Sequence, residues 1–416
     1  MLILYRFLIN IVCFLSPIIF KIRIYKNKED KKRYKEKLCI IKKKRPKGRL
    51  VWFHASSVGE LLSVLPLIEK IEKIKNIKTI LFTSNTLSSS KVLMQKKKFK
   101  KIIHQFLPID TEEFANSFLN HWKPDAAFFI ESEIWPNFIF NIKQKKIPLI
   151  LINGRITNKT YNSWKKIYNF SKKIFENFDL CLVQNEETKK YLKYFKVKKI
   201  LNLGNIKFAK SKYFLPSKTN KKIKDLSKNR NIWCASSTHY NEEELCAKIH
   251  TELKKKIKNL ITIIIPRHIN RTEEIFEKLK TMNLKIYKHN DYGKIQKNTD
   301  IYLVNTYGET PDFYNISNFV FLGGSFINHG GQNPIEPARL GCKIYHGPNV
   351  HNFAEVYKYL NSAKISNKVK NIKDLKKNLI NEFTLNYKKN YKFRKQIDLI
   401  GQKILNDIFF RIKVYL

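Results

Sequence analysis

Short apolar runs alternate with amphipathic stretches along the chain from residue 50 onwards. The stretches 61–75 and 111–122 have the apolar spacing of helices. The apolar runs, which predict strands, lie at 50–54, 79–84, 102–107, 126–130, 149–153, 180–183 and 200–203. Strands that alternate with helices form parallel sheets through β-α-β units. The pattern therefore predicts one α/β domain over residues 49–206.

A second series of the same kind follows a polar, Lys-rich stretch at 207–229, which contains Pro216 and predicts a linker. Its strand candidates are 232–235, 261–265, 284–287, 301–304, 319–322 and 343–345, and the tail 374–416 has a helical pattern. This series predicts a second domain over residues 230–416. The fold class is then α/β, with two Rossmann-like domains that face a cleft and bind ligands at the carboxyl ends of their strands.

The first 20 residues are apolar but are interrupted by Arg6, Asn10 and Pro17, whereas a spanning helix needs about 20 apolar residues. Residues 21–49 then carry 15 Lys or Arg and three acids, a net charge of +12. Such basic residues stay on the cytosolic side and attract anionic lipid. We therefore expect residues 1–48 to form a membrane anchor with a basic juxtamembrane segment. The alternative is an apolar helix that packs on the protein's own core.

The whole chain has 81 Lys and Arg against 34 Asp and Glu, a net charge of +47. This excess favours an anionic partner, such as a phosphorylated substrate, an anionic membrane or nucleic acid. Drift in an A/T-rich genome explains it equally well, because 69 of the 81 basic residues are Lys. The six cysteines form no C-x-x-C pair, and the chain lacks H-E-x-x-H and D-x-D motifs. We therefore expect neither a metal nor a cofactor.

Glycine is concentrated in one segment, since six of the 13 glycines fall within residues 323–347. The segment reads GGSFINHGGQNPIEPARLGCKIYHG, with a strand before it and a helix predicted to begin at Ile335. Glycine lets a backbone approach a ligand closely, and a helix N-terminus attracts anions. The segment predicts a nucleotide or phosphate site, with Glu336 bonded to ribose hydroxyls. The alternative is an ordinary connection between strands.

Carboxylates follow two strands of the first series. Glu60 lies in HASSVGE, three residues after Ser57, which is the spacing of a helix capping box. Glu131 and Glu133 lie in IESEIWP, where buried carboxylates need partners or perform chemistry. Arg155, in INGRIT, could bind Glu131 or an anionic ligand through its planar guanidinium.

Eight sequence blocks together resemble one family. In chain order they are HASSVGE, IESEIWPN, INGRIT, GNIKF, ASSTHYNEEE, PRHINR, NTYGE and GGSFINHGGQNPIEPARLG. The blocks occur in this order in the 3-deoxy-D-manno-octulosonic acid (Kdo) transferases, and the resemblance spans roughly residues 1–355. That family is similar to other two-domain GT-B glycosyltransferases, and it passes Kdo from CMP-Kdo to the lipid A precursor.

The resemblance implies roles for individual residues. Glu60 is implied as the general base of an inverting transfer, and Glu131 and Lys207 as residues that stabilise the transition state. The implied CMP-contacting residues are Pro266, Arg267, Tyr307, Gly308, Glu309, Asn333, Pro334, Ile335 and Glu336. The implied partners are CMP-Kdo, the lipid A precursor and anionic lipid at the cytoplasmic face of the inner membrane, with no nucleic acid.

Three other functions remain open from the residues alone. The first is a GT-B transferase that uses a UDP-sugar and another lipid acceptor. The second is a basic nucleic-acid-binding protein, although the chain lacks compact aromatic–basic RNA motifs. The third is a membrane scaffold without catalytic activity.

Overall fold

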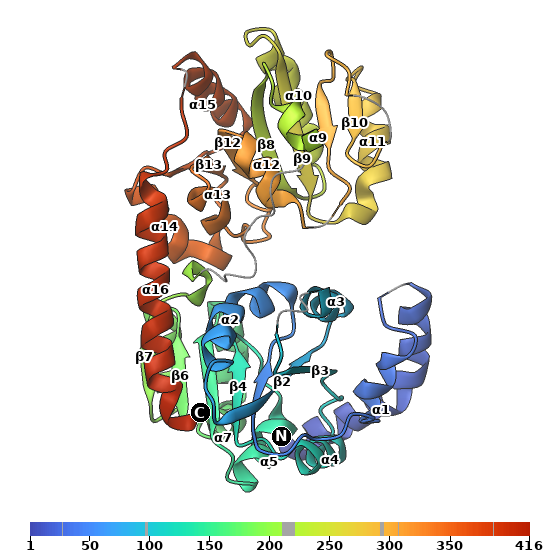
Figure 1. Ribbon diagram of the computed structural model, residues 1–416, viewed down its shortest axis with the longest axis vertical. Coiled ribbons are helices and arrows are strands. Elements are labelled where there is room, and N and C mark those ends of the chain that lie inside the picture. Colours follow the sequence, from blue (N-terminus) through green and yellow to red (C-terminus); the bar gives the residue numbers. More distant parts are fainter. Residues whose placement is uncertain (27, 96–98, 210–220, 292–294, 307, 386) are drawn as a thin grey trace. The chain divides into compact units, whose positions relative to one another are not determined.

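The computed structural model describes residues 1–26, 28–95, 99–209, 221–291, 295–306, 308–385 and 387–416 (Figure 1). The chain forms two compact units. The N-terminal unit comprises Met1–Phe214 and Leu399–Leu416, and the C-terminal unit comprises Leu215–Asp398. Within the described residues, each unit holds one seven-stranded sheet in which every strand pair is parallel. The predicted fold class of two Rossmann-like α/β domains is confirmed.

The sheet of the N-terminal unit has the strand order β3-β2-β1-β4-β5-β6-β7. The strands are β1 (Arg49–His54), β2 (Ile77–Ser84), β3 (Ile102–Phe106), β4 (Ala126–Ile130), β5 (Leu149–Gly154), β6 (Leu180–Val183) and β7 (Ile200–Asn202). The helices after α1 are α2 (Val58–Ile71), α3 (Leu87–Gln95), α4 (Glu112–Trp122), α5 (Pro136–Gln144), α6 (Asn158–Lys166), α7 (Tyr168–Phe175) and α8 (Glu186–Tyr194). Every strand predicted for this half is present.

One face of this sheet packs against α4, α5, α7 and α8 through a single cluster of buried side chains. Trp52 of β1 is fully buried there, with the rings of Phe118 and Phe138 at 5.0 and 5.6 Å. Its indole N–H donates to Thr83 Oγ1 at 2.8 Å, so its polar atom has a partner. Aromatic pairs of this kind add about 0.5–1.5 kcal/mol each beyond their buried area. They hold the end of β1, from which the candidate site begins.

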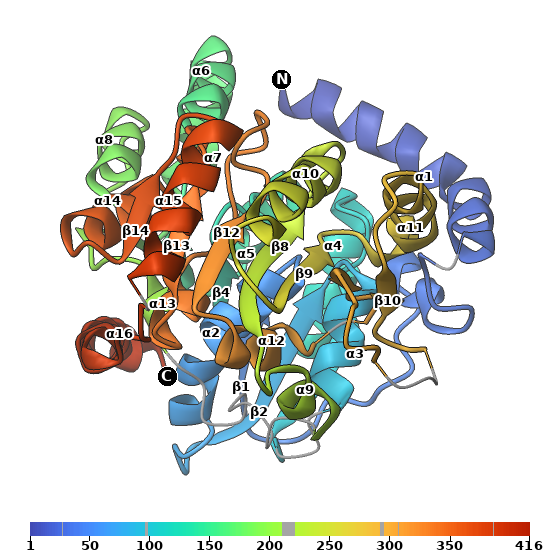
Figure 2. The ribbon, with the colours of Figure 1, turned by 90° about the horizontal axis from the view of Figure 1, so that it is seen from above.

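The sheet of the C-terminal unit has the order β10-β11-β9-β8-β12-β13-β14. The strands are β8 (Asn231–Thr238), β9 (Leu260–Pro266), β10 (Ile286–Lys288), β11 (Ile301–Leu303), β12 (Phe319–Leu322), β13 (Lys343–His346) and β14 (Ser366–Lys368). The helices are α9 (Lys221–Leu226), α10 (Glu242–Lys254), α11 (Thr272–Lys280), α12 (Thr310–Ile316), α13 (Ile335–Arg339), α14 (Ala354–Ser362) and α15 (Ile372–Thr384). Figure 2 shows α10 and α15 over this sheet, where they share a buried cluster with its strands.

The first helix, α1 (Leu2–Tyr25), is 24 residues long, and by length and composition it could cross a membrane. It exposes large apolar side chains such as Ile3 and Phe14, which are 84% and 83% exposed. Its first turn nevertheless packs on the unit, because Leu2 and Tyr5 contact the buried cluster of the first sheet. The start of α1 thus packs on the core, as the alternative expects, and the membrane anchor stays a prediction for the exposed remainder of the helix.

The basic segment after α1 is folded into the N-terminal unit, and residues 1–48 are no separate domain. Lys37 is buried and pairs with the buried Glu29 at 2.7 Å. Arg33 donates twice to Glu36, at 2.8 and 2.9 Å. These cations bond to acids and to carbonyl oxygens of the unit, which ties the segment to it. Only part of the predicted net charge of +12 is therefore available to bind lipid.

The C-terminal boundary also differs from the predicted domain of residues 230–416, since 399–416 belong to the N-terminal unit and 215–229 to the C-terminal unit. The boundary falls within α16 (Lys392–Ile412). A Cβ on Gly401 would overlap the carbonyl oxygen of Phe208, and Ile404 lies against Gly204.

The predicted linker 207–229 contains regular structure at both ends, namely η2 (Ile206–Phe208) and α9. Its residues 210–220 lie outside the described residues.

Gly401→Ala is expected to destabilise the protein by about 1–3 kcal/mol, because the helix cannot approach η2 with a methyl group between them. The measurement is the free energy of unfolding in urea. Gly59→Ala is the matched control: its Cβ would meet only Ser57 Oγ at 4.0 Å, and alanine stabilises a helix by roughly 0.5–1 kcal/mol. Equal stability of the Gly401 variant and the wild type would show that the close approach is unimportant.

Candidate active site

The carboxyl ends of β1, β4 and β5 lie side by side because these strands are parallel neighbours. Ser57 follows β1 and caps α2, and Glu60 completes the cap from the first turn of the helix. One oxygen of Glu60 accepts from the backbone N–H of Ser56 at 2.8 Å, and the other accepts from Ser57 Oγ at 3.0 Å. The predicted capping box is confirmed.

Glu60 is half-buried, and its charge is disfavoured for two reasons. Burial raises its pKa first, and the negative charges of Glu133 and Glu131 raise it further, to about 7. The hydrogen bonds from Ser57 and Ser56 oppose the shift only in part. A carboxylate with a pKa near the working pH is well suited to accept a proton during catalysis.

Glu131 and Lys207 form an ion pair at the same edge, with 2.6 Å between Lys207 Nζ and Glu131 Oε1. Asn153 Nδ2 also donates to this oxygen, at 3.3 Å, and Asn153 Oδ1 accepts from the backbone N–H of Ile206. Glu131 and Asn153 have positive φ angles of 57° and 56°. Residues other than glycine adopt this conformation rarely, and often at functional sites. The structure thus brings together two of the residues implied by the resemblance.

Glu133, which the sequence analysis singles out only as an unusual carboxylate, contacts three side chains at the same edge of the sheet. Its Oε2 accepts from Ser56 Oγ at 2.8 Å and from Trp135 Nε1 at 2.9 Å, and it lies 3.0 Å from His54 Nε2. Burial opposes ionisation, but these hydrogen bonds hold the pKa of Glu133 below its ordinary value. Glu133 therefore stays charged and contributes to the raised pKa of Glu60.

Arg155 follows β5 and contacts Glu131 through the backbone, where its N–H donates to the Glu131 carbonyl at 3.2 Å. Ser132 Oγ in turn donates to the carbonyl of Arg155 at 2.7 Å. Burial lowers the pKa of the Arg155 guanidinium, although the charges of Glu131 and Glu187 oppose that shift. Arg155 thus bonds to Glu131 through its backbone, and the predicted contact of its guanidinium with Glu131 or an anionic ligand stays a prediction.

In the C-terminal unit, implied CMP-contacting residues follow the carboxyl ends of strands. Pro266 ends β9 and is buried, and Arg267 is exposed, with its backbone N–H bonded to the Thr238 carbonyl at 2.9 Å. Gly308 is exposed, and Glu309 lies 3.1 Å from His289 Nε2. Tyr307 lies outside the described residues.

The Gly-rich segment forms a tight loop directly after β12. A Cβ on Gly323 would lie 2.6 Å from the carbonyl oxygen of Ser237, so only glycine fits there. The buried carboxylate of Glu242 accepts from the backbone N–H groups of Gly324 at 2.7 Å and His239 at 3.0 Å. Burial raises its pKa despite these bonds. Glu242 was not predicted, because the pattern ASSTHYNEEE does not indicate which of its three acids are buried.

The helix predicted at Ile335 is present as α13 but has only five residues. Asn333 Oδ1 accepts from the backbone N–H of Ile335 at 3.1 Å, and Pro334 is buried. Glu336 is exposed in the first turn. Asn333, in the loop that follows β12, and Glu336, in the first turn of α13, therefore both come after the carboxyl end of that strand.

A group of histidines lies beside the same loop and was also missed. The ring of His239 lies 4.2 Å from that of His329 and 6.2 Å from that of His268. Burial and the positive charges of neighbouring groups lower the pKa of His239 to about 4. The ring is therefore neutral at physiological pH.

Comparisons with known proteins place the chain in a family. Residues 32–210 match the family model described as "3-Deoxy-D-manno-octulosonic-acid transferase (kdotransferase)". A 3-deoxy-D-manno-octulosonic acid transferase of Rickettsia bellii is 34% identical over 372 residues, which are 89% of this chain and 88% of that protein. This chain belongs to the Kdo transferase family. A Kdo transferase of Haemophilus influenzae is 30% identical, over 76% of this chain and 74% of that protein.

Membership in the Kdo transferases confirms the predicted family and a glycosyltransferase activity in lipid A and lipopolysaccharide biosynthesis.

The fold has more distant relatives too. A UDP-GlcNAc 2-epimerase from Neisseria meningitidis, solved with UDP-GlcNAc, has a TM-score of 0.58 at 12% identity and covers 88% of this chain and 99% of its own. At that identity the likeness concerns the fold alone.

Proposed function

We propose that this Kdo transferase moves Kdo from CMP-Kdo to the lipid A precursor with inversion, at the cytoplasmic face of the inner membrane. The observation that carries the proposal is the group of three carboxylates, Glu60, Glu131 and Glu133, at one edge of the first sheet. The group contains a base with a pKa near 7 and an acid paired with Lys207. These are the groups that a single displacement without a metal requires.

In the proposed reaction, the acceptor hydroxyl attacks the anomeric carbon of Kdo and loses its proton to Glu60. The new bond joins the acceptor oxygen to that carbon, while the bond from the carbon to the CMP phosphate breaks. Positive charge that develops on the sugar is balanced by Glu131, and Lys207 stabilises the negative charge of the departing phosphate. CMP leaves with the bonding electrons, and one displacement inverts the anomeric centre.

We assign CMP to the carboxyl end of the C-terminal sheet, with Pro266, Arg267, Tyr307, Gly308, Glu309, Asn333, Pro334, Ile335 and Glu336. Exposed Arg267 and exposed Glu336 support this assignment, because one can bind phosphate and the other can accept from ribose hydroxyls. The long apolar α1 and its basic flank support a position on anionic membrane lipid.

The direct test of the activity is incubation of the full-length protein with CMP-Kdo and a tetraacylated, bisphosphorylated lipid A precursor, with products read by mass. One added Kdo or more is expected. A parallel panel of UDP-sugars tests the main alternative donor class. Turnover with a UDP-sugar, and none with CMP-Kdo, would overturn the proposed donor.

Arg267→Ala and Glu336→Ala are each expected to weaken CMP binding by roughly tenfold or more, as for loss of a hydrogen bond to a charged group. Calorimetric titration with CMP measures the effect. Arg394→Ala and Glu273→Ala are matched controls, because both are solvent-exposed residues of the same unit that form ion pairs away from the implied CMP-contacting residues. Unchanged CMP affinity in both test variants would place the donor site elsewhere.

A further inference from the structure

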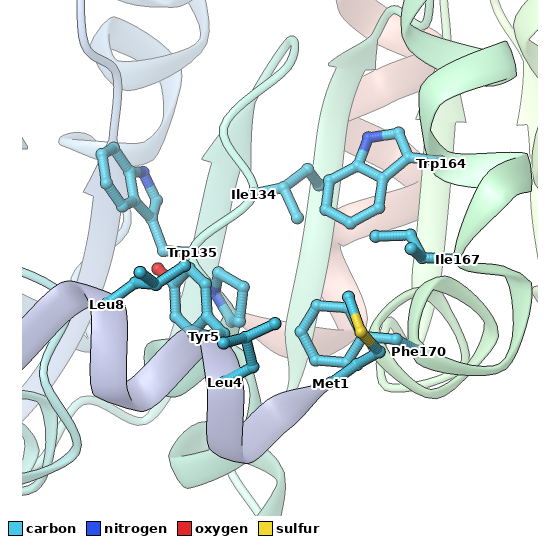
Figure 3. A pocket seen from close by; sticks show the side chains of 10 residues that line it. Met1, Leu4, Tyr5, Leu8, Ile134, Trp135, Trp164, Ile167 and Phe170 are labelled. Carbon is cyan, nitrogen blue, oxygen red and sulfur yellow. The ribbon is translucent and has the colours of Figure 1, made fainter.

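An apolar pocket of about 280 Å³ lies in the N-terminal unit beside the first turns of α1 (Figure 3). Its walls include Met1, Leu4 and Leu8 of α1, Ile134 and Trp135 of the loop before α5, and Trp164 of α6. The volume approaches the roughly 300–1,000 Å³ of small-ligand sites, so it suits part of one hydrocarbon chain and not a whole lipid. We propose that this pocket binds one acyl chain of the lipid acceptor, an inference that rests on the proposed function.

The pocket adjoins the carboxylate group of the candidate active site through Trp135. Ile134 and Trp135 directly follow Glu133, and Trp135 Nε1 donates to Glu133 Oε2 at 2.9 Å. One side chain thus forms a pocket wall and a hydrogen bond to the active-site acid. An acyl chain in the pocket therefore lies beside the acids that must meet the acceptor's sugar. This adjacency favours the acceptor over bulk lipid as the source of the chain.

Hydrogen bonds hold α1 against the unit, so that this wall of the pocket is fixed. Tyr5 Oη donates to Asp110 at 2.7 Å, and Asp110 also accepts from the backbone N–H groups of Asn137 and Phe138 at the start of α5. Arg6 donates to Asn137 Oδ1 at 3.0 Å. The same acid thus links α1 to the helix that follows the Glu131–Trp135 loop.

The surroundings of the pocket also suit a phosphorylated lipid. Other side chains of α1 outside the pocket lining, such as Ile3 and Phe7, are 84% and 61% exposed and offer an apolar surface to a bilayer. On α6, Trp164 lines the pocket, and the next two residues, Lys165 and Lys166, are exposed cations. A lipid with acyl chains and phosphate groups matches an apolar pocket whose wall helix α6 also carries exposed cations.

The test is a series of bisphosphorylated acceptors with acyl chains of increasing length, assayed with the full-length protein and CMP-Kdo. Each methylene that enters an apolar site should lower KM roughly fourfold, until the pocket is full. Leu4→Phe, which fills the pocket, should move that limit to shorter chains, and Trp164→Ala should reduce the preference for acylated over deacylated disaccharide. Phe14→Ala, on the exposed part of α1, is the matched control and should keep the wild-type chain-length profile.

A binding measurement separates failure of this inference from failure of the proposed function. Brominated acyl chains on the bisphosphorylated lipid should quench tryptophan fluorescence, and Trp164→Phe should remove part of the quenching, whether or not transfer occurs. An unchanged chain-length profile in Leu4→Phe and Trp164→Ala would overturn the inference. Equal quenching by brominated phosphatidylglycerol would also overturn it, because the occupant would then be bulk lipid.

Discussion

Replacing Glu60 with Gln is expected to lower kcat by roughly 10²–10⁴-fold, the usual contribution of a general base. Glutamine cannot take the acceptor's proton, but its carbonyl oxygen can still accept from the backbone N–H of Ser56 and keep the helix cap. CMP affinity should not change. Turnover at saturating CMP-Kdo and acceptor, with calorimetric titration of CMP, checks the result. Near wild-type turnover would mean that Glu60 is a helix cap only.

The raised pKa of Glu60 adds two signatures to this prediction. In the wild type, kcat/KM should fall as pH drops below about 7, because the base becomes protonated, and the variant should lose that limb. The folded state also holds this proton more tightly than the unfolded chain, whose pKa is near 4.5. The contribution of Glu60 to stability therefore falls as pH rises from about 4.5 through 7. The Tm of Glu60→Gln at pH 8 should accordingly be no lower than that of the wild type.

Lys207→Met is expected to destabilise the protein by about 3–5 kcal/mol, because it leaves the buried carboxylate of Glu131 without its partner. It should also abolish most transfer, since the departing phosphate loses a cation. Urea unfolding and turnover are the two measurements.

The double variant Glu131→Gln/Lys207→Met separates these two effects. Removing both charges should restore much of the stability, because no buried charge is left unpaired. It should not restore activity, because neither the sugar nor the phosphate regains its charged partner. Recovery of activity together with stability would show that the pair acts only in folding.

The apolar runs of the sequence located the described strands other than β14, because a parallel strand buried on both faces has a continuous hydrophobic pattern. Strand β14 (Ser366–Lys368) was missed for the same reason, since its residues are polar and it pairs only with β13. Both ends of the five-residue α13 have local signals. Its start was predicted from Asn333 and Pro334, and its early end follows from Gly341, whose φ of 78° lets its backbone N–H donate to the Ala338 carbonyl at 3.1 Å.

The candidate site was predictable only in part. The capping spacing of Ser57 and Glu60 is local and can be read from the sequence. The Glu131–Lys207 pair joins residues far apart in the chain and depends on the positive φ of Glu131, so only the resemblance named it. The helical pattern of α16 shows that one face is buried but not which unit buries it, and residues 399–416 were therefore assigned to the wrong half.

Because α16 completes the N-terminal unit, this unit is built from the first and the last parts of the chain. Ile408 and Ile412 are almost fully buried, and Lys70 contacts Phe409 of the same helix. During translation, the C-terminal unit emerges complete while the N-terminal unit still lacks this helix. The unit that carries the proposed base thus becomes complete only after residues 399–416 have left the ribosome. A chain that lacks these residues would then hold an unfinished unit around Glu60 and Glu131, although both side chains had been synthesised long before.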